Sequence, residues 1–252
     1  MKTILLTIDG TRVSAYEGDT ILEAAKRSGI YIPTLCHHPL LKNSGACRMC
    51  VVEIEGTGRQ NFNSACTTPA ADDMVVHTAT PDIQRMRRMN LELIFSERNH
   101  QCPYCEKSGN CELQAMAYRI GMNQVRFPFL WPKKTVDSSH PEVLRDPSRC
   151  ILCARCVRAS AEVDNKGIFA VKGRGIDSDI TVNIEENLGA TDVSGEDAAV
   201  QVCPTGALCA KGLAYSIRYG TRMYDQQPIT YLPEPKAPRK TGAKKKKAQQ
   251  GL

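Results

Sequence analysis

Apolar and polar residues alternate in several short stretches before residue 80, which is the pattern of strands with one buried face. The pair Asp9-Gly10 separates the first two stretches and favours a tight hairpin turn. After the second stretch, Asp19 or Thr20 is placed to cap a helix and Gly29 is placed to end it. The pattern therefore predicts strands at residues 2–8, 12–16, 51–55 and 74–77, with one helix at residues 21–28.

A helical period replaces this alternation from Thr80-Pro81 onward, with proline at the favoured first helical position. We expect the apolar residues of this helix to fill the core and its arginines to face solvent. The apolar residues are Ile83, Met86, Met89, Leu93 and Ile94, and the arginines are Arg85, Arg87 and Arg88.

The rest of the chain predicts shorter elements. A helix is expected at residues 111–119, closing at Gly121, and strands are expected at residues 168–171 and 180–183. The apolar segment 127–132 contains two prolines and predicts a connector that packs between modules. Gly173-Arg174-Gly175 predicts a turn between these strands. It is not a dinucleotide-binding loop, because it lacks the third glycine and a following helix.

Length and composition limit where the protein acts. The 252 residues contain no run of about 18 apolar residues, so no membrane span is predicted. The first apolar stretch is interrupted early by Asp9, unlike a secretory signal. We therefore expect a cytoplasmic protein, in which reduced cysteines favour metal binding over disulfides.

The formal net charge of +6 arises at the end of the chain, where seven basic residues and one acid follow Leu232. Four of the basic residues form the run Lys244 to Lys247. The stretch after Leu232 lacks large apolar residues, so residues 232–252 are predicted to be a disordered basic tail. We prefer the interpretation of this tail as a solvated terminus. The alternative is a docking arm for an acidic partner or nucleic acid.

Eleven of the twelve cysteines fall into three groups, each with spacing typical of iron–sulfur ligands. The first group is Cys36, Cys47, Cys50 and Cys66. Small residues before Cys47 let backbone N–H groups approach cluster sulfides. Structural zinc is the alternative, but zinc modules usually pair two short Cys-x2–4-Cys elements and this group has one.

The second group, Cys102, Cys105 and Cys111, is one ligand short of the four that a cubane needs. His100 is the only nearby candidate, and its neutral imidazole would make the cluster less negative and favour the reduced state. A cluster completed by water or an outside ligand is the alternative. His37 and His38 follow a group with four cysteines already, so we expect them beside the cluster or at the surface.

The third group is Cys150, Cys153 and Cys156, joined by the distant Cys203-Pro204. In two-cluster proteins a fourth cysteine soon after the triplet serves the other cluster, but Ser160 stands there and the chain has no second triplet. Cys203 is therefore expected to complete the same 4Fe–4S cluster. Cys209 belongs to no group and is expected to be a buried structural thiol.

Four segments carry a resemblance to a known family: residues 31–36, 99–103, 106–114 and 149–157. Their order resembles the electron-input end of the large iron–sulfur subunit of complex I and accessory regions of iron-only hydrogenases. It is most similar to the small diaphorase subunit of cytoplasmic NAD-reducing nickel–iron hydrogenases, over residues ~1–225. Complex I sites usually read His-x3-Cys, which would put the ligand at Arg98, whereas the spacing His100-x-Cys102 is similar to that of the hydrogenase family.

The resemblance implies an α+β fold of three modules. Residues 1–79 would form a β-grasp 2Fe–2S ferredoxin-type domain, residues 80–135 a helical His(Cys)3 4Fe–4S module, and residues 136–231 a single-cluster 4Fe–4S ferredoxin-like domain. The implied cofactors are one 2Fe–2S and two 4Fe–4S clusters. Their ligands would be Cys36, Cys47, Cys50 and Cys66; His100, Cys102, Cys105 and Cys111; and Cys150, Cys153, Cys156 and Cys203.

The implied function is an electron relay between an FMN- and NAD-binding diaphorase partner and the small and large subunits of a nickel–iron hydrogenase. We find no flavin, nickel or nucleotide motif, so the chain is not expected to reduce NAD alone. The same relay in a NAD-dependent formate dehydrogenase, an electron-bifurcating hydrogenase or a complex I-like assembly is the alternative. A zinc protein with its tail on nucleic acid is another class, but 6% aromatic residues and the absence of zinc-finger spacing argue against a nucleic-acid partner.

Overall fold

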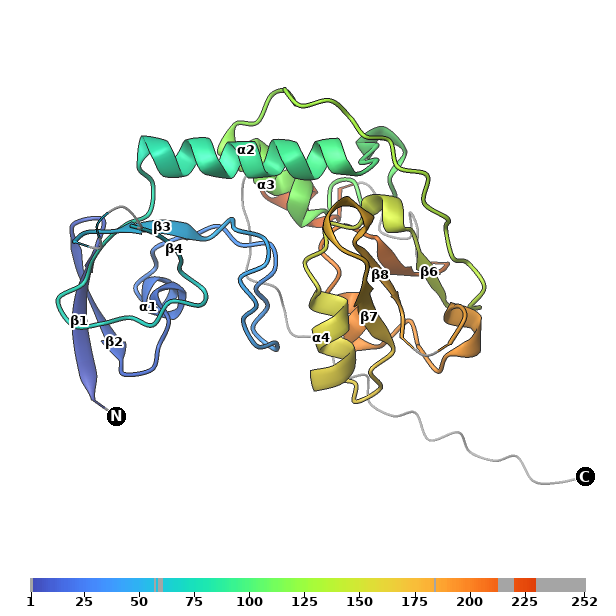
Figure 1. Ribbon diagram of the computed structural model, residues 1–252, viewed down its shortest axis with the longest axis horizontal. Helices are drawn as coiled ribbons and strands as arrows, with labels where there is room; N and C mark the ends of the chain where they lie inside the picture. Colours follow the sequence, from blue (N-terminus) through green and yellow to red (C-terminus); the bar gives the residue numbers. More distant parts are fainter. Residues whose placement is uncertain (1, 57, 59–60, 184, 213–219, 230–252) are drawn as a thin grey trace, which may run out of the picture.

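A computed structural model describes residues 2–56, 58, 61–183, 185–212 and 220–229. A sheet module lies at one end and a module of short hairpins and helices at the other, with a loop around residues 36–47 between them (Figure 1). The long helix α2 (Pro81–Glu97) runs from the sheet module toward the second module along one side of the molecule (Figure 1). The mixture of separate helices and sheets confirms the α+β class.

The first module is a mixed five-stranded sheet in the order β2-β1-β5-β3-β4. β1 pairs antiparallel with β2 and parallel with β5, and β3 pairs antiparallel with both β4 and β5. The predicted strands are confirmed, and β4 is an additional one. The bounds are β1 Thr3–Ile8, β2 Thr11–Tyr16, β3 Val51–Ile54, β4 Phe62–Ser64 and β5 Val75–His77.

Helix α1 (Ile21–Arg27) packs its apolar residues into the same core as the sheet. Thr20 is the residue that caps it: its hydroxyl accepts from the Glu23 N–H at 3.3 Å, and the Glu23 carboxylate accepts from the Thr20 N–H at 2.7 Å. Asp19 instead accepts from Arg27. Gly29 follows the helix with φ 72°, a conformation that glycine adopts without steric cost.

Helix α2 begins where predicted, but its buried face is different. Ile83, Arg87 and Leu91 are buried at four-residue intervals, whereas Met89 and Leu93 are 39% and 44% exposed. The expectation that Arg87 faces solvent is wrong, and so is the expectation that Met89 and Leu93 fill the core. The physical reason is that the Arg87 guanidinium donates to the backbone carbonyls of Met49 and Val51.

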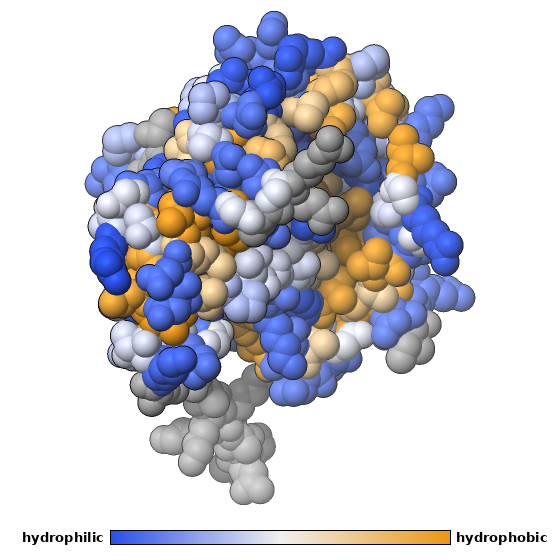
Figure 2. Space-filling view, turned by 60° about the vertical axis from the view of Figure 1, so that its left-hand side comes forward, coloured by the Kyte–Doolittle hydropathy of each residue, from blue (hydrophilic) through white to orange (hydrophobic). Residues whose placement is uncertain are grey.

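Helix α3 (Glu112–Ile120) packs beside α2 and ends at Gly121, which has φ 69°. The connector that follows does not pack between modules as expected, because Phe129, Leu130 and Trp131 are 44%, 48% and 57% exposed. Phe129 and Trp131 instead stack on each other, with ring centroids 5.2 Å apart. On the face drawn in Figure 2, apolar residues form several patches separated by hydrophilic ones.

The module at the other end contains two antiparallel strand pairs, β6 with β9 and β7 with β8. The strands predicted at residues 168–171 and 180–183 are confirmed within a residue as β7 and β8, and the glycine pair between them forms a turn. The bounds are β6 Val143–Arg145, α4 Arg155–Glu162, β7 Phe169–Lys172, β8 Asp179–Val182, α5 Ala198–Gln201 and β9 Leu208–Ala210. The last described helix, α6 (Met223–Gln226), instead contacts the segment between Cys105 and Cys111, where the Tyr224 N–H donates to the Gly109 carbonyl at 3.2 Å. Short 3-10 turns lie at Cys102–Tyr104, Pro147–Arg149, Gly175–Asp177 and Leu188–Ala190.

Two sequence predictions concern the membrane and the tail. Among the helices of the described ranges, none is both long and apolar enough to cross a bilayer. The basic tail at residues 232–252 lies outside the described residues.

Candidate metal centres

The first cysteine group closes around one point at the edge of the sheet module. Cys36 lies in the segment after α1, Cys47 and Cys50 lie just before β3, and Cys66 follows β4. Cys36, Cys50 and Cys66 are each 1% exposed. The Leu35 N–H donates to the Cys47 sulfur at 3.4 Å, the kind of backbone contact that tunes cluster thiolates.

The thiols of this group form hydrogen bonds with each other. Hydrogen bonds from Cys47 and Cys66 hold the pKa of Cys36 far below its usual range, and a hydrogen bond from Cys66 lowers the pKa of Cys50 to about 7. The pKa values of the donors Cys47 and Cys66 are raised by these same bonds and by burial. The four sulfurs therefore lie within reach of one another, as ligands of one cluster must.

A buried arginine fixes the loop that carries Cys47 and Cys50. Arg87 of α2 donates from Nε to the Met49 carbonyl at 2.9 Å and from a terminal nitrogen to the Val51 carbonyl at 2.7 Å. Burial lowers the pKa of Arg87 to about 10, so the guanidinium stays charged near neutral pH. Within the loop, Arg48 adopts φ 53°, a left-handed conformation that turns the chain between the two cysteines.

His100, Cys102, Cys105 and Cys111 all line one cavity of about 250 Å³. His100 follows α2, and Cys111 immediately precedes α3, so the two helices bring these ligands together. The buried Nε2 atom of His100 has no hydrogen-bond partner among the described residues. A buried, unpaired imidazole nitrogen beside three thiols is the feature that a missing metal bond leaves.

The protonation state of this group suits metal binding. Burial, followed by the charges of Arg98 and Arg149, lowers the pKa of His100 to about 4, so its imidazole is neutral and a lone pair is available. Burial raises the pKa of Cys111 to about 12 and also raises that of Cys102. These thiols would lose their protons on binding iron, which couples assembly to proton release.

Cys150, Cys153, Cys156 and Cys203 line a second, smaller cavity of about 30 Å³. Leu152 and Ala154 have φ 53° and 52°, so the loop between the cysteines turns sharply inward. The Leu152 N–H donates to the Cys150 sulfur at 3.4 Å. Burial raises the pKa of Cys150 to about 12 and that of Cys153 to about 11.

Three residues outside the groups were also candidates from the sequence. His37 is buried and contacts Lys26 at 3.0 Å and Asn43 at 2.7 Å, and His38 is 2% exposed, so neither lies at the surface. Cys209 was expected to be buried, but its thiol is only half-buried and donates toward the Glu106 carboxylate at 3.9 Å. Across the described ranges, no three His, Cys, Asp or Glu side chains are arranged to hold a single metal ion. This finding concerns one ion, whereas the ligands of the three groups would surround a cluster of several iron atoms.

Sequence reasoning missed two arginines of α4. Arg155 forms two 2.8 Å bonds to the Glu112 carboxylate, which follows Cys111 directly. Arg158 donates to the carbonyls of Cys36 and Cys153 at 2.6 and 3.2 Å. The signal available was their position, since one lies inside the cysteine triplet and the other two residues after it.

Three families match consecutive parts of the chain. Residues 1–81 match a 2Fe-2S iron-sulfur cluster binding domain, and residues 87–126 match the NADH-ubiquinone oxidoreductase-G iron-sulfur binding region. Residues 140–209 match the ferredoxin-like domain of NADH-quinone oxidoreductase subunit 3. These matches support iron–sulfur binding in each of the three parts.

Longer similarities extend across most of the chain. The gamma subunit of the NAD-reducing hydrogenase HoxS of Cupriavidus necator is 35% identical over 228 residues, covering 90% of this chain and 95% of that protein. The mitochondrial 78 kDa subunit of NADH-ubiquinone oxidoreductase of Candida albicans is 35% identical over 86% of this chain, but this chain covers only 30% of it. A chain in the crystal structure of a NAD+-reducing [NiFe]-hydrogenase in the H2-reduced state superposes with a TM-score of 0.85 at 40% identity, covering 92% of this chain and 97% of that chain.

Proposed function

The chain belongs to the family of the gamma subunit of NAD-reducing hydrogenase, to which the large iron–sulfur subunits of complex I are also similar, and from this premise we propose its role in detail. It is an electron-transfer iron–sulfur subunit of a NAD-reducing hydrogenase or complex I-like assembly. In our proposal it carries electrons between an FMN- and NAD-binding diaphorase subunit and the small and large subunits of a nickel–iron hydrogenase.

The proposed cofactors are three clusters, each of which takes up and releases electrons one at a time. A 2Fe–2S cluster would be held by Cys36, Cys47, Cys50 and Cys66. One 4Fe–4S cluster would be held by His100, Cys102, Cys105 and Cys111, and the other by Cys150, Cys153, Cys156 and Cys203. The corresponding domains would be residues 1–79, 80–135 and 136–231.

The observation that carries this proposal is the unpaired Nε2 atom of the buried His100, which lines one cavity with the three cysteines of its group. A histidine that merely filled space would be expected to have a hydrogen-bond partner for that nitrogen. A ligand role explains why the site tolerates it.

The chain's own residues do the rest of the work. Backbone N–H groups of Leu35 and Leu152 donate to cysteine sulfurs, which stabilises the more negative, reduced state of a cluster. Arg87 holds the Cys47–Cys50 loop in place. We propose no catalytic residue, so NAD reduction would require the partner subunits.

Metal analysis and spectroscopy test the proposal directly. Protein purified without oxygen should contain roughly ten iron and ten sulfide atoms per chain, the content of one 2Fe–2S and two 4Fe–4S clusters. His100→Ala should change one 4Fe–4S signal in electron paramagnetic resonance and leave the other two clusters unaltered. Colourless, iron-free protein would refute the relay, and an unchanged spectrum would remove His100 from the ligand set.

The hydrogenase and complex I-like settings are separated by the partners. The 40% identity to a chain of a NAD+-reducing [NiFe]-hydrogenase favours the first setting, and the 35% identity to the 78 kDa subunit of a mitochondrial NADH-ubiquinone oxidoreductase supports the second as the alternative. Affinity purification of the full chain from its own cells should recover nickel and hydrogen-dependent NAD reduction. Recovery of NADH-quinone activity without nickel would favour the alternative. The cytoplasmic location stays a prediction.

A further inference from the structure

The side chain of Arg158 lies between the first and third cysteine groups. One terminal nitrogen of its guanidinium donates to the Cys36 carbonyl at 2.6 Å and to the Cys153 carbonyl at 3.2 Å. Both acceptors belong to residues whose thiols are proposed ligands. A single nitrogen atom therefore links the backbone of one ligand residue to the backbone of another, across 117 positions of sequence.

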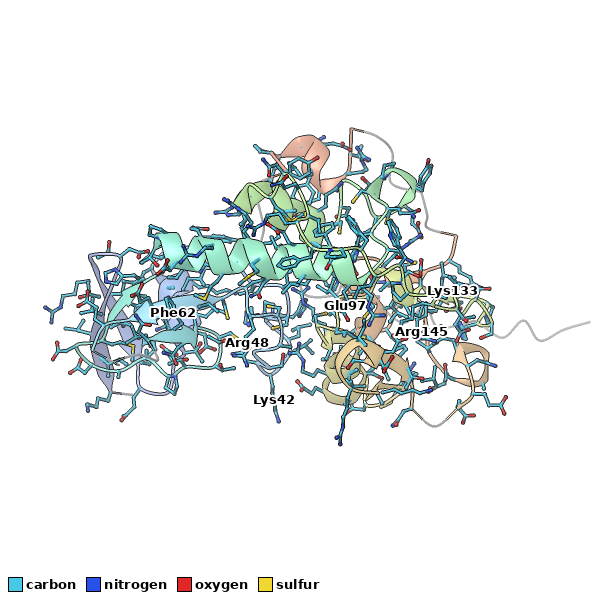
Figure 3. The ribbon with its side chains drawn as sticks, turned by 45° about the horizontal axis from the view of Figure 1, so that its top comes forward. Lys42, Arg48, Phe62, Glu97, Lys133 and Arg145 are labelled. Atoms are coloured by element: carbon cyan, nitrogen blue, oxygen red, sulfur yellow. The ribbon has the colours of Figure 1, made fainter. Side chains whose placement is uncertain are left out.

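The rest of the guanidinium is held by the same two segments. Its Nε donates to the Ala154 carbonyl at 3.2 Å, and its other terminal nitrogen donates to the Lys42 carbonyl. One helical turn later, the Glu162 carboxylate accepts from the Lys42 N–H at 2.9 Å. Lys42 lies at the outer tip of the loop between the sheet module and α4 (Figure 3). Helix α4 thus holds both the backbone N–H and the carbonyl of one residue in this loop.

Apolar packing reinforces the same junction. Leu41, beside Lys42, is 7% exposed and belongs to the hydrophobic cluster of the third module rather than that of the sheet module. The segment 36–42 is therefore anchored at one end by Cys36 in the first group and at the other by packing against the third module. Arg158 spans the gap between these two anchors.

The charge of Arg158 bears on the potentials of nearby clusters. All four of its acceptors are neutral carbonyls, and in the described part of the chain it forms no ion pair. The nearby Glu162 carboxylate accepts from the Lys42 N–H instead. A positive charge without an ion-pair partner favours the more negative state of any redox centre nearby. Reduction makes an iron–sulfur cluster more negative, so the charge favours reduction on both sides of the junction.

We propose that Arg158 is a positioning residue for electron transfer between the first and third clusters, which holds their ligand loops at a fixed separation and raises both reduction potentials. This inference rests on the proposed function, since it requires both clusters to be present. The several donors of the guanidinium would set the separation of the two ligand loops, and its charge would set the reduction potentials, so two substitutions separate the two contributions.

The test uses the full chain with its clusters assembled. Arg158→Gln removes the charge and the fork, Arg158→Lys keeps the charge alone, and Arg174→Gln removes the charge of an exposed arginine in the same module. Potentiometric titration followed by electron paramagnetic resonance gives the potentials of the first and third clusters. The magnetic interaction between the two reduced clusters, measured from microwave-power saturation, reports their separation.

We expect Arg158→Gln to shift the potentials of the first and third clusters downward by roughly tenfold in the reduction equilibrium, or ~59 mV for a one-electron couple. It should also weaken the magnetic interaction. Arg158→Lys should keep the potentials near those of the wild type but lose part of the interaction, and Arg174→Gln should match the wild type in both. The second cluster serves as an internal reference.

Several results would overturn the inference. With iron and sulfide contents of the wild type, unchanged potentials and an unchanged interaction in Arg158→Gln would mean that Arg158 only fills space. If Arg158→Gln loses a cluster, the lysine variant decides: a wild-type interaction in that variant removes the positioning role. Absence of clusters in the wild type would instead refute the proposed function itself, so the two failures are distinguishable.

Discussion

Replacing Glu112 by alanine leaves the Arg155 guanidinium buried without its carboxylate. Arg155 is 1% exposed and Glu112 is 28% exposed at their side chains, and the two are joined by parallel bonds of 2.8 Å. The pair links α3, which follows the second cysteine group, to α4, which carries part of the third. Glu112→Ala therefore tests whether a buried ion pair holds these two modules together.

The size of the effect follows from burial. Removing one partner of a buried ion pair typically costs about 3–5 kcal/mol, because the remaining charge is left uncompensated. Glu112 is partly exposed and Arg155 keeps a 3.3 Å bond to the Val202 carbonyl, so we expect a value near the lower limit, about 3 kcal/mol. The double substitution Glu112→Leu with Arg155→Met removes both charges and should recover to within about 1 kcal/mol of the wild type.

Urea unfolding without oxygen, followed by cluster absorbance and far-ultraviolet circular dichroism, measures these differences. A loss of about 3 kcal/mol should lower the midpoint by roughly 1 M or more. The matched control is Asp82→Ala, which breaks the exposed Asp82–Arg85 pair and should cost less than about 1 kcal/mol. A Glu112→Ala protein as stable as the control, or a double variant no better than the single one, would refute the reasoning.

Three further predictions concern other parts of the chain. Burial lowers the pKa of His38 to about 4, so below about pH 6.5 the unfolded chain binds a proton at His38 that the folded chain does not bind. The free energy of unfolding should therefore fall by up to roughly 3 kcal/mol as the pH falls from about 6.5 to about 4. The urea midpoint of His38→Gln should depend less steeply on pH than that of the wild type. Gly206→Ala should cost more than Gly212→Ala in the same assay, because both have φ 72° but only at Gly206 would the new methyl lie 3.0 Å from a described neighbour, Lys107; equal costs would contradict the crowding argument. Deleting residues 233–252 should leave iron and sulfide contents unchanged, and lost clusters would show that the tail is structural.

The parts of the fold that could be predicted from the sequence are those with local causes. The hairpin at Asp9-Gly10 and the helix cap at Asp19 or Thr20 are encoded within a few residues; the hairpin is confirmed, and Thr20 is the cap. Strands β4, β6 and β9 were not predicted: each has only three residues, and β6 pairs with a strand about 65 positions away, so no local turn signal marks the pair. The buried face of α2 was misjudged because a hydrophobic pattern counts Arg87 as a polar residue.

The same limit applies to the candidate sites. The cysteines could be grouped from their spacing because closely spaced thiols in this pattern are typical of metal ligands. The links between the groups could not be found, because they join side chains to backbone carbonyls more than 100 positions apart, as at Arg158 and Cys36. A backbone carbonyl carries no residue-specific signal, so no pattern in the sequence marks it as an acceptor.

These links have a common physical origin. Most cysteines of the three groups lie in irregular loops, and the carbonyls of such loops lack partners in a helix or sheet. An unpaired buried carbonyl is costly, and water would compete with the cluster for the same space. Arginine has several N–H donors on one rigid, planar guanidinium, so it can pair such carbonyls in the place of water. Arg87 donates to the first group's loop, Arg155 to the carbonyl before Cys203, and Arg158 to two loops at once.

This origin also explains why the substitutions above should differ in kind. A lysine in place of any of these arginines keeps the charge but satisfies fewer carbonyls, so it should loosen a loop without removing the local positive potential. A neutral residue loses both. If lysine and glutamine variants of Arg87 changed the potential of the first cluster equally, charge would not be what these arginines contribute, and their role would reduce to satisfying the loop carbonyls.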